Sequence, residues 1–376
     1  MNFKLDDEHL LVQRAIRDFA RERLAPNARR WDEEERFPLE LVPELAELGL
    51  TGITVPTELG GAGFDVLGNA IAIEEVAAGD GSIALSVAAH NGLCLGHLML
   101  AGSDEQRRRF VPRLAAGEAL GAWALTEPSA GSDAAAAQTK AVREGDGWQL
   151  NGTKQFITNG SIAGLYVVIA ATAPRQLSAF VVERDTAGLR PGKTEKKLGL
   201  HASDTAVVHL DNVRVPATQL LGTPGQAFRD VKQVLDKGRI GIAALAVGLA
   251  RAAFEYAVGY ARTREQFGQP LARHGAIQQK LADMRVKLEA SRLLAHRAAW
   301  LADSGQEFRV AASQAKLFAS ESATAIALDA IQILGGYGYL RDHPVERILR
   351  DVKLMEIGEG TSEVQRMVIA RHELSA

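Results

Sequence analysis

The runs Tyr166-Val167-Val168-Ile169-Ala170 and Ala179-Phe180-Val181-Val182 mark a block of β-structure in the middle of this chain. A third run, Ala206-Val207-Val208-His209-Leu210, precedes the turn residues Asp211-Asn212. Strand formers in short runs, about ten residues apart, predict a small antiparallel sandwich or barrel. Asn151-Gly152, which follows Trp148-Gln149-Leu150, predicts a hairpin turn within the same block.

Helical patterns flank this block on both sides. Residues 71–100 are rich in Ala and Leu, and Leu281, Met284 and Leu288 repeat at a spacing of three to four residues. Another helix covers residues 309–334 and ends at Gly335-Gly336. The order predicts an α+β fold. Its three domains are an N-terminal helical domain (1–120), a central small antiparallel β-barrel or sandwich (121–225) and a C-terminal domain resembling a four-helix bundle (226–376).

Composition narrows the class of protein. The 376 residues are 47% hydrophobic and 24% charged, with a net charge of -3, which does not favour binding to nucleic acid. Cys94 is the only cysteine, so we expect no internal disulfide and a reducing compartment, the cytoplasm. We expect no signal peptide and no membrane span, because the N-terminus reads directly into an amphipathic helix.

Several catalytic motifs are absent. The sequence has no GxGxxG, no HExxH and no GxSxG, which argues against a Rossmann site, a zincin site and a serine nucleophile. Residues 188–194 approach a phosphate-binding loop but have one residue too few between the glycines. His90 and His97 could share a helix face, but they lack further ligands, so we predict no metal site.

Glu359 stands between two glycines, Gly358 and Gly360, just before a helix start at Thr361 or Ser362. Glycine on both sides lets the backbone approach a ligand closely. The pattern therefore fits either a carboxylate at the edge of a cavity or a solvated acid in an ordinary turn, and by itself it does not separate the two.

Six segments together resemble the acyl-CoA dehydrogenase family of flavoproteins, nearest to its short- and medium-chain members. They occur in the family's order and span nearly the whole chain. They are residues 123–133 (WALTEPSAGSD), 154–160 (KQFITNG), 235–239 (LDKGR), 262–268 (RTREQFG), 332–336 (QILGG) and 350–366, which contains Glu359.

The resemblance implies an FAD site. It places Thr126 near flavin N1 and O2, Thr158 near N5 and O4, and Phe156 where an aromatic residue, usually Trp, lies beside the ring. Arg264, which the resemblance assigns to a neighbouring subunit, would bind the pyrophosphate through its guanidinium. The full implied set is Trp123, Leu125, Thr126, Gly131, Ser132, Phe156, Ile157, Thr158, Arg264, Phe267, Gln332, Leu334, Gly335, Gly336, Thr361 and Glu363.

The resemblance also implies the reaction. Glu359 would remove the α-proton of a fatty acyl-CoA while the β-hydrogen leaves as hydride to flavin N5, giving a trans-2-enoyl-CoA. Burial should raise the pKa of this carboxyl from about 4.3 toward ~6–7. Ser132, Asp236, Arg239 and Gly360 would contact the substrate. Electrons would pass to electron-transferring flavoprotein, and the family is usually a homotetramer.

Some positions depart from the family pattern. Gly358 replaces a common Tyr, which should open the acyl pocket and leaves chain length and branching undecided. Gly238 stands where isovaleryl-type members carry their base, which leaves Glu359 as the candidate. Gly275 replaces a common Gln and His201 a common Arg.

Three kinds of protein fit this sequence. The first is an FAD-dependent dehydrogenase. The second is an oxidase or other flavoenzyme of the same fold that reacts with O₂. The third is a non-catalytic helical binding protein, which the two threonines and Glu359 argue against.

Overall fold

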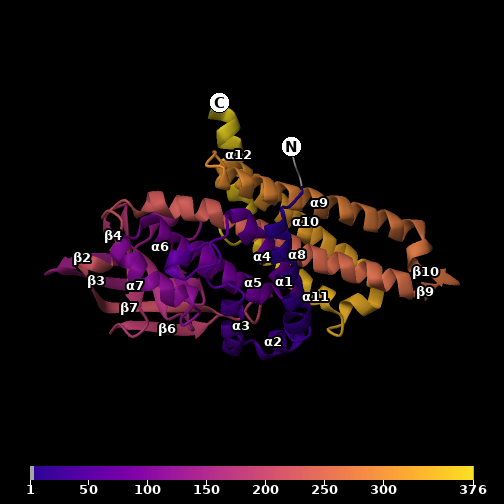
Figure 1. Ribbon diagram of the computed structural model, residues 1–376, viewed down its shortest axis with the longest axis horizontal. Coiled ribbons are helices and arrows are strands. Elements are labelled where there is room, and N and C mark those ends of the chain that lie inside the picture. The colour runs from indigo at the N-terminus through magenta and orange to yellow at the C-terminus, as the bar shows by residue number, and fades with distance from the viewer. Residues whose placement is uncertain (1–3, 376) are drawn as a thin grey trace.

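The computed structural model describes residues 4–375, and in it a β-sheet lies at one end and long helices at the other (Figure 1). The expected α+β class is confirmed. The chain changes from helix to strand between Ala115 and Gly121, and returns to helix at Ala227. The bounds of the predicted domains remain predictions.

Short helices form the N-terminal part, and polar caps set several of their starts. Asp6 accepts a hydrogen bond from the His9 amide at 2.9 Å, and Asp80 accepts from the amides of Ser82 and Ile83. The helices are α1 Asp7–Phe19, η1 Ala20–Leu24, α2 Ala28–Glu34, η2 Leu39–Leu41, α3 Val42–Glu47, η3 Thr57–Leu59, α4 Val66–Gly79, α5 Gly81–Ala88, η4 Ala89–Leu95, α6 Gly96–Ala101 and α7 Asp104–Ala115.

An eight-stranded sheet occupies the centre of the chain. Its order is β6-β7-β3-β2-β4-β5-β8, with β1 paired to β4. The strands are β1 Gly121–Ala124, β2 Lys140–Glu144, β3 Gly147–Thr158, β4 Leu165–Ala173, β5 Gln176–Glu183, β6 Leu189–Thr194, β7 Thr205–Pro216 and β8 Leu220–Leu221. Most pairs are antiparallel, as expected, but β1 runs parallel to β4 and β2 meets β4 through one parallel pair.

The predicted hairpin at Asn151-Gly152 is wrong. Both residues lie inside β3, where the pairing with β7 shifts register between Leu150 and Gly152. A side chain at position 152 would overlap Thr139, so the glycine serves a bulge and a close approach, the other common use of glycine in a strand.

Alternation along β4 explains how the sheet joins two cores. Val167 and Ile169 face a core shared with α6, α7 and the start of α8, whereas Tyr166, Val168 and Ala170 face the core enclosed by the sheet itself. All five side chains are fully buried. The strand is therefore covered on both faces, which fits its continuous apolar sequence.

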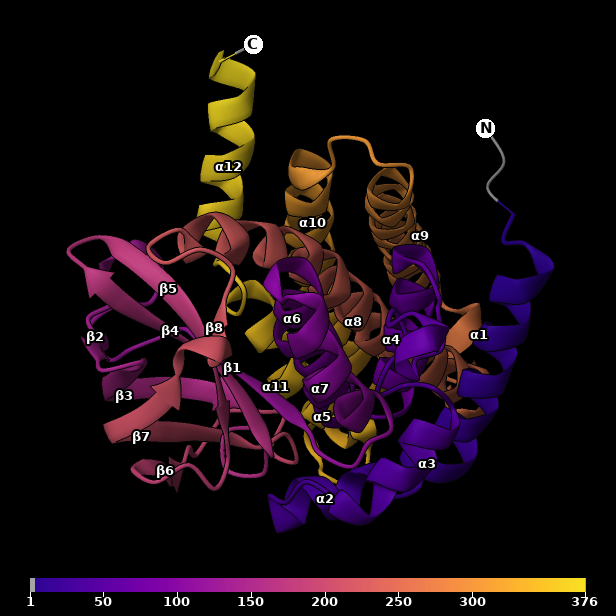
Figure 2. The same ribbon diagram turned by 60° about the vertical axis from the view of Figure 1, so that its left-hand side comes forward.

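Long helices form the C-terminal part. They are α8 Ala227–Thr263, α9 Gly275–Asp303 and α10 Arg309–Leu334, followed by η8 Gly335–Tyr339, α11 Pro344–Val352, η9 Lys353–Glu356 and α12 Ser362–Ser375. Strands β9 Glu265–Gln266 and β10 Gln269–Pro270 and the turn η7 Leu271–Arg273 lie between α8 and α9. Helix α4 packs against both α8 and α9, so the fourth member of the bundle comes from the N-terminal part. Helix α12 stands out from the body (Figure 2).

By length and composition alone, three helical segments are long and apolar enough to cross a membrane. They are Gly81–Ala101, Ala227–Thr263 and Arg309–Tyr339. Between 50% and 78% of each apolar window is buried inside the protein. Their hydrophobicity is therefore used largely in packing helix against helix within the fold.

Candidate active site

Two loops that carry the predicted flavin-edge threonines lie side by side. Thr126 follows β1, Thr158 ends β3, and the carbonyl of Thr126 accepts a hydrogen bond from the Gln155 amide at 2.9 Å. Both threonines are half-buried, and among the described residues neither hydroxyl has a hydrogen-bond partner. Two free hydroxyls at one rim fit the polar edge of a flavin, which needs donors placed by the protein.

A buried ion pair holds these two loops together. The Lys154 ammonium lies 2.7 Å from Glu127 and also donates to the Leu125 carbonyl at 3.0 Å. Glu127 accepts further bonds from the amides of Gln138 and Thr139. Burial lowers the pKa of Lys154 to about 8, although Glu127 opposes that shift. Both residues lie in the segments that carry the family resemblance, but the sequence assigned a role to neither of them.

Substitution of Lys154 by Met should destabilise the protein by about 3–5 kcal/mol and release flavin, because Glu127 would remain buried without its cation. Urea unfolding and the flavin content of the purified protein measure the two effects. Lys140→Met, on exposed β2, is the matched control. The double variant Lys154→Met/Glu127→Leu should recover most of the lost stability. Stability and flavin content equal to those of Lys140→Met would refute the role assigned to the pair.

Some of the other predicted cofactor residues on these loops are buried, and some are exposed to solvent. The side chains of Trp123, Leu125 and Ile157 are buried, so only their backbones could face a flavin. The Trp123 indole N–H donates to His97 at 3.0 Å. Phe156 is 59% exposed with a positive φ of 59°, and a free ring beside the threonines suits an aromatic wall. Gly131 and Ser132 are exposed in the loop after β1.

The predicted pyrophosphate residues lie at the other end of the molecule (Figure 1). The Arg264 guanidinium lies 5.4 Å above the Tyr337 ring, next to the glycine turn that ends α10. Arg264, Gln332, Gly335 and Gly336 are exposed, Phe267 is 95% exposed, and Leu334 is buried. One chain therefore does not bring this group to Thr126 and Thr158.

Glu359 adopts a left-handed backbone, with φ 53°, and Gly360 follows with φ 96°. Its Oε2 atom is fully buried, and among the described residues it has no hydrogen-bond partner. Burial raises the pKa of Glu359 to about 7, against the opposing charges of Lys316 and Arg239. Thr361 caps α12 by accepting from the Val364 amide at 3.3 Å, and Glu363 lies in the first turn of that helix.

Gly238 on α8 faces this carboxylate directly. A methyl group built on Gly238 would overlap Oε2 of Glu359 and would lie 3.3 Å from Leu93. Leu93 belongs to η4, which packs against both α8 and β1. The base candidate and strand β1 are therefore joined through one short helix, and a side chain at position 238 would displace the Glu359 carboxylate.

Asp236 and Arg239 pair with each other on α8 at 2.6 Å. Arg239 also donates to Ser313 at 3.3 Å and is 8% exposed. The structure brings this pair toward Glu359, because the charge of Arg239 acts on that carboxyl.

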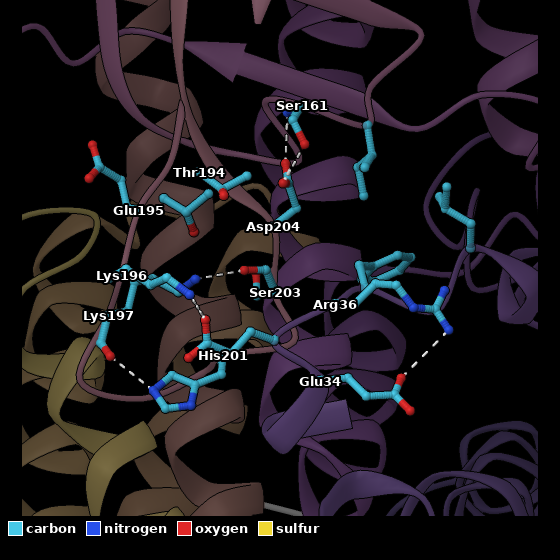
Figure 3. A pocket seen from close by; sticks show the side chains of 15 residues that line it. Glu34, Arg36, Ser161, Thr194, Glu195, Lys196, Lys197, His201, Ser203 and Asp204 are labelled. Atoms are coloured by element: carbon cyan, nitrogen blue, oxygen red, sulfur yellow. Dashed lines mark hydrogen bonds and ion pairs between the residues drawn. The ribbon is translucent and has the colours of Figure 1, made fainter. Parts of the chain in front are cut away.

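A cavity of about 350 Å³ lies between α2 and the sheet (Figure 3). Thr205 in its lining is the partner of Thr158 in the pairing of β7 with β3. Its charged groups bind one another: Lys196 pairs with Glu35, and Ser161 donates to Asp204 at 2.6 Å. His201, whose role the sequence left open, donates to the Lys197 carbonyl at 2.9 Å and lies 3.1 Å from Asp32. These contacts join the segment between β6 and β7 to α2. Phe37, Leu39 and Ile162 supply apolar lining beside these charged groups.

His90 and His97 are buried structural residues. Gly121 donates its amide to His90 at 2.8 Å, and burial lowers the pKa of both imidazoles to about 4. Within residues 4–375, no group of three or more His, Cys, Asp or Glu side chains could hold a metal. Gly275 begins α9 and has open space beside it. The side chain of the Gln that is common at this position in the family is therefore missing, together with any contact that it would make.

Comparisons with known proteins identify the family of this chain. Models of the acyl-CoA dehydrogenase N-terminal, middle and C-terminal domains match residues 6–118, 122–213 and 225–374. A probable acyl-CoA dehydrogenase of Bacillus subtilis is 47% identical, covering 100% of both chains.

Two solved structures are similar to this chain over its full length, and each match covers 100% of both chains. One is butyryl-CoA dehydrogenase from Megasphaera elsdenii, with a TM-score of 0.98 and 40% identity. The other comes from work on the electron transferring flavoprotein of Acidaminococcus fermentans, with a TM-score of 0.98 and 41% identity.

The fold and the site define a flavin-dependent oxidoreductase that acts on the CH–CH bond of an acyl-CoA. The chain belongs to the acyl-CoA dehydrogenase family.

Proposed function

We propose that this chain converts an acyl-CoA to the trans-2-enoyl-CoA with Glu359 as the base. The observation that carries the proposal is the buried Oε2 atom of Glu359, which has no partner in the described part of the chain and faces Gly238. An unpaired buried carboxylate costs stability, so its retention fits a group kept free for a proton.

The residues around Glu359 suggest how the proton is removed. Among the described residues, neither the Glu359 nor the Gly360 backbone N–H has an acceptor. We infer that the Glu359 N–H donates to the thioester oxygen as negative charge develops there, which acidifies the α-carbon. The Glu359 carboxylate then accepts the α-proton. FAD, when bound, supplies the acceptor for the β-hydrogen, and Thr126, Thr158 and Phe156 would hold its ring.

The pH dependence of kcat/KM should report the carboxylate. Glu359 acts as a base only when ionised, and burial raises its pKa to about 7. We therefore expect kcat/KM to be full above that value and to fall about tenfold for each pH unit below it. A profile measured with a dye acceptor from pH 5 to 9 tests this. An acid limb near 4.5 would show a solvated carboxyl and contradict the burial.

For the substrate we propose a short acyl chain, with branching tolerated near the reacting carbons. The butyryl-CoA relative supports the length. A side chain at Gly358 would make only ordinary contacts with Leu354, so the glycine leaves space beside the base.

A panel of straight and branched acyl-CoA thioesters with an artificial acceptor tests both statements. Highest kcat/KM for chains beyond ten carbons would refute the first, and rejection of every branched thioester would refute the second. Stoichiometric peroxide in air would favour an oxidase. Protein that stays colourless after FAD is added would favour a non-catalytic role.

Three further features belong to the proposal. Electrons would pass to an electron-transferring flavoprotein, which the work on the A. fermentans relative supports. The chain would act as a homotetramer, since the junction of α8 and β9, which contains Arg264, lies at the end of the molecule opposite the sheet (Figure 1); a monomer in solution would argue against it. A cytoplasmic location is supported by the single cysteine, Cys94, buried and unpaired.

A further inference from the structure

The carbonyl oxygen of Gly360, next to the base, is held by two side chains from two different helices. The Lys316 ammonium of α10 donates to it at 2.7 Å, and the Gln365 amide of α12 donates at 2.8 Å. A carbonyl has two lone pairs, so both are used. Because Glu359 and Gly360 both have positive φ, the loop needs such restraint to keep one conformation.

Lys316 is an unusual choice for this task. Its side chain is fully buried, and among residues 4–375 no carboxylate lies within ion-pair distance of it. Burial of an ammonium without a counter-ion is costly, and a neutral amide could satisfy the same carbonyl, as Gln365 does. The positive charge therefore calls for an explanation beyond the hydrogen bond.

The Lys316 ammonium is bound to the residue next to Glu359, and of the carboxylates that act on its charge Glu359 acts most strongly. Lys316 from α10 and Arg239 from α8 are the cations that act on the Glu359 carboxyl, and Lys316 is the stronger of the two. Arg239 is already neutralised by Asp236 at 2.6 Å. Glu356 on η9 and Glu363 on α12 also act on Lys316, but Glu356 is bound to Lys353 and Thr324. Lys316 is thus the uncompensated cation beside the base.

We propose that Lys316 is a positioning residue for the base: its ammonium fixes the loop through the Gly360 carbonyl, and its charge favours the ionised form of Glu359. This inference rests on the proposed role of Glu359. The two side chains that donate to the Gly360 carbonyl then have different roles. Gln365 only holds the loop in place, whereas Lys316 holds the loop and also supplies a positive charge.

Three variants separate these tasks. Lys316→Met removes the hydrogen bond and the charge, Lys316→Gln keeps a donor without charge, and Gln365→Leu removes a donor and keeps the charge. Loss of the charge raises the pKa of Glu359. The acid limb of kcat/KM should therefore move up by about one pH unit in both Lys316 variants and stay in place in Gln365→Leu.

The plateau above the limb reports the geometry of the loop. We expect a plateau lowered about tenfold or more in Lys316→Met and in Gln365→Leu, and a smaller loss in Lys316→Gln. Bound-flavin absorbance and thermal unfolding identify the folded variants, and Lys316→Gln carries the test if Lys316→Met does not fold. A native acid limb in a folded, flavin-loaded Lys316→Gln would overturn the proposal.

Glu359→Gln keeps this failure distinct from failure of the proposed function. If Glu359→Gln is inactive while the Lys316 variants keep the native limb, only the role of Lys316 is wrong. If Glu359→Gln turns over at a near-native rate, the base assignment is wrong and the role of Lys316 falls with it.

Discussion

Glu359→Gln should bind flavin and acyl-CoA normally but lose turnover by about 10²–10⁴-fold, the usual contribution of a general base. The amide has almost the same shape as the carboxyl group, so the loop between Gly358 and Thr361 should keep its conformation. An amide cannot accept the α-proton, however, and position 238, the alternative base position that the family resemblance implies, is glycine.

Stopped-flow reduction of bound flavin by an acyl-CoA measures this loss without a second substrate. Titration of flavin absorbance with a non-reacting thioester shows whether binding is preserved. The matched control is Glu321→Gln, which removes an exposed carboxylate paired with Arg366 and should change turnover less than twofold. Near-native flavin reduction by Glu359→Gln would mean that another group takes the proton.

Gly238→Ala should lower kcat about 10²-fold while leaving the fold intact. The added methyl group would overlap Oε2 of Glu359, so the carboxylate must turn away, and a displacement of about 1 Å at a reacting group costs on that order. Alanine is the better helix former by about 1 kcal/mol, so α8 itself should not be weakened. The variant thus separates activity from stability.

Gly241→Ala is the control for this prediction. It lies one turn further along the same helix, is buried, and has open space where its methyl group would stand. Its kcat should be close to that of the unmodified enzyme, and its thermal midpoint should be the same or higher. Equal kcat values for the two alanine variants would show that Gly238 does not position the base.

The order of elements could be predicted from the sequence, because it depends on local patterns. The end of α10 at Leu334 followed from the Gly335-Gly336 pair. The start of α12 followed from the pair Thr361-Ser362, of which Thr361 is the cap in the structure. The hairpin at Asn151-Gly152 failed because the same dipeptide also suits a bulge, and only the partner strand decides between them.

The sequence by itself determined the α+β class, the positions of the flavin-edge threonines and the glycines around Glu359. These are properties of short segments, where turn chemistry and periodicity act within a few residues. The resemblance then assigned roles to those segments.

Tertiary structure alone decided the state of the carboxylate. Oε2 lies against Gly238, which is 121 positions away in sequence, and Lys316 of α10 holds the neighbouring Gly360 carbonyl. Tertiary structure also brings Lys154 into contact with Glu127. It places the junction of α8 and β9, which contains Arg264, at the end of the molecule opposite the sheet. Desolvation and charge act through space rather than along the chain, so the raised pKa of Glu359 was expected only through the family resemblance, and the contact that Lys316 makes was not predicted.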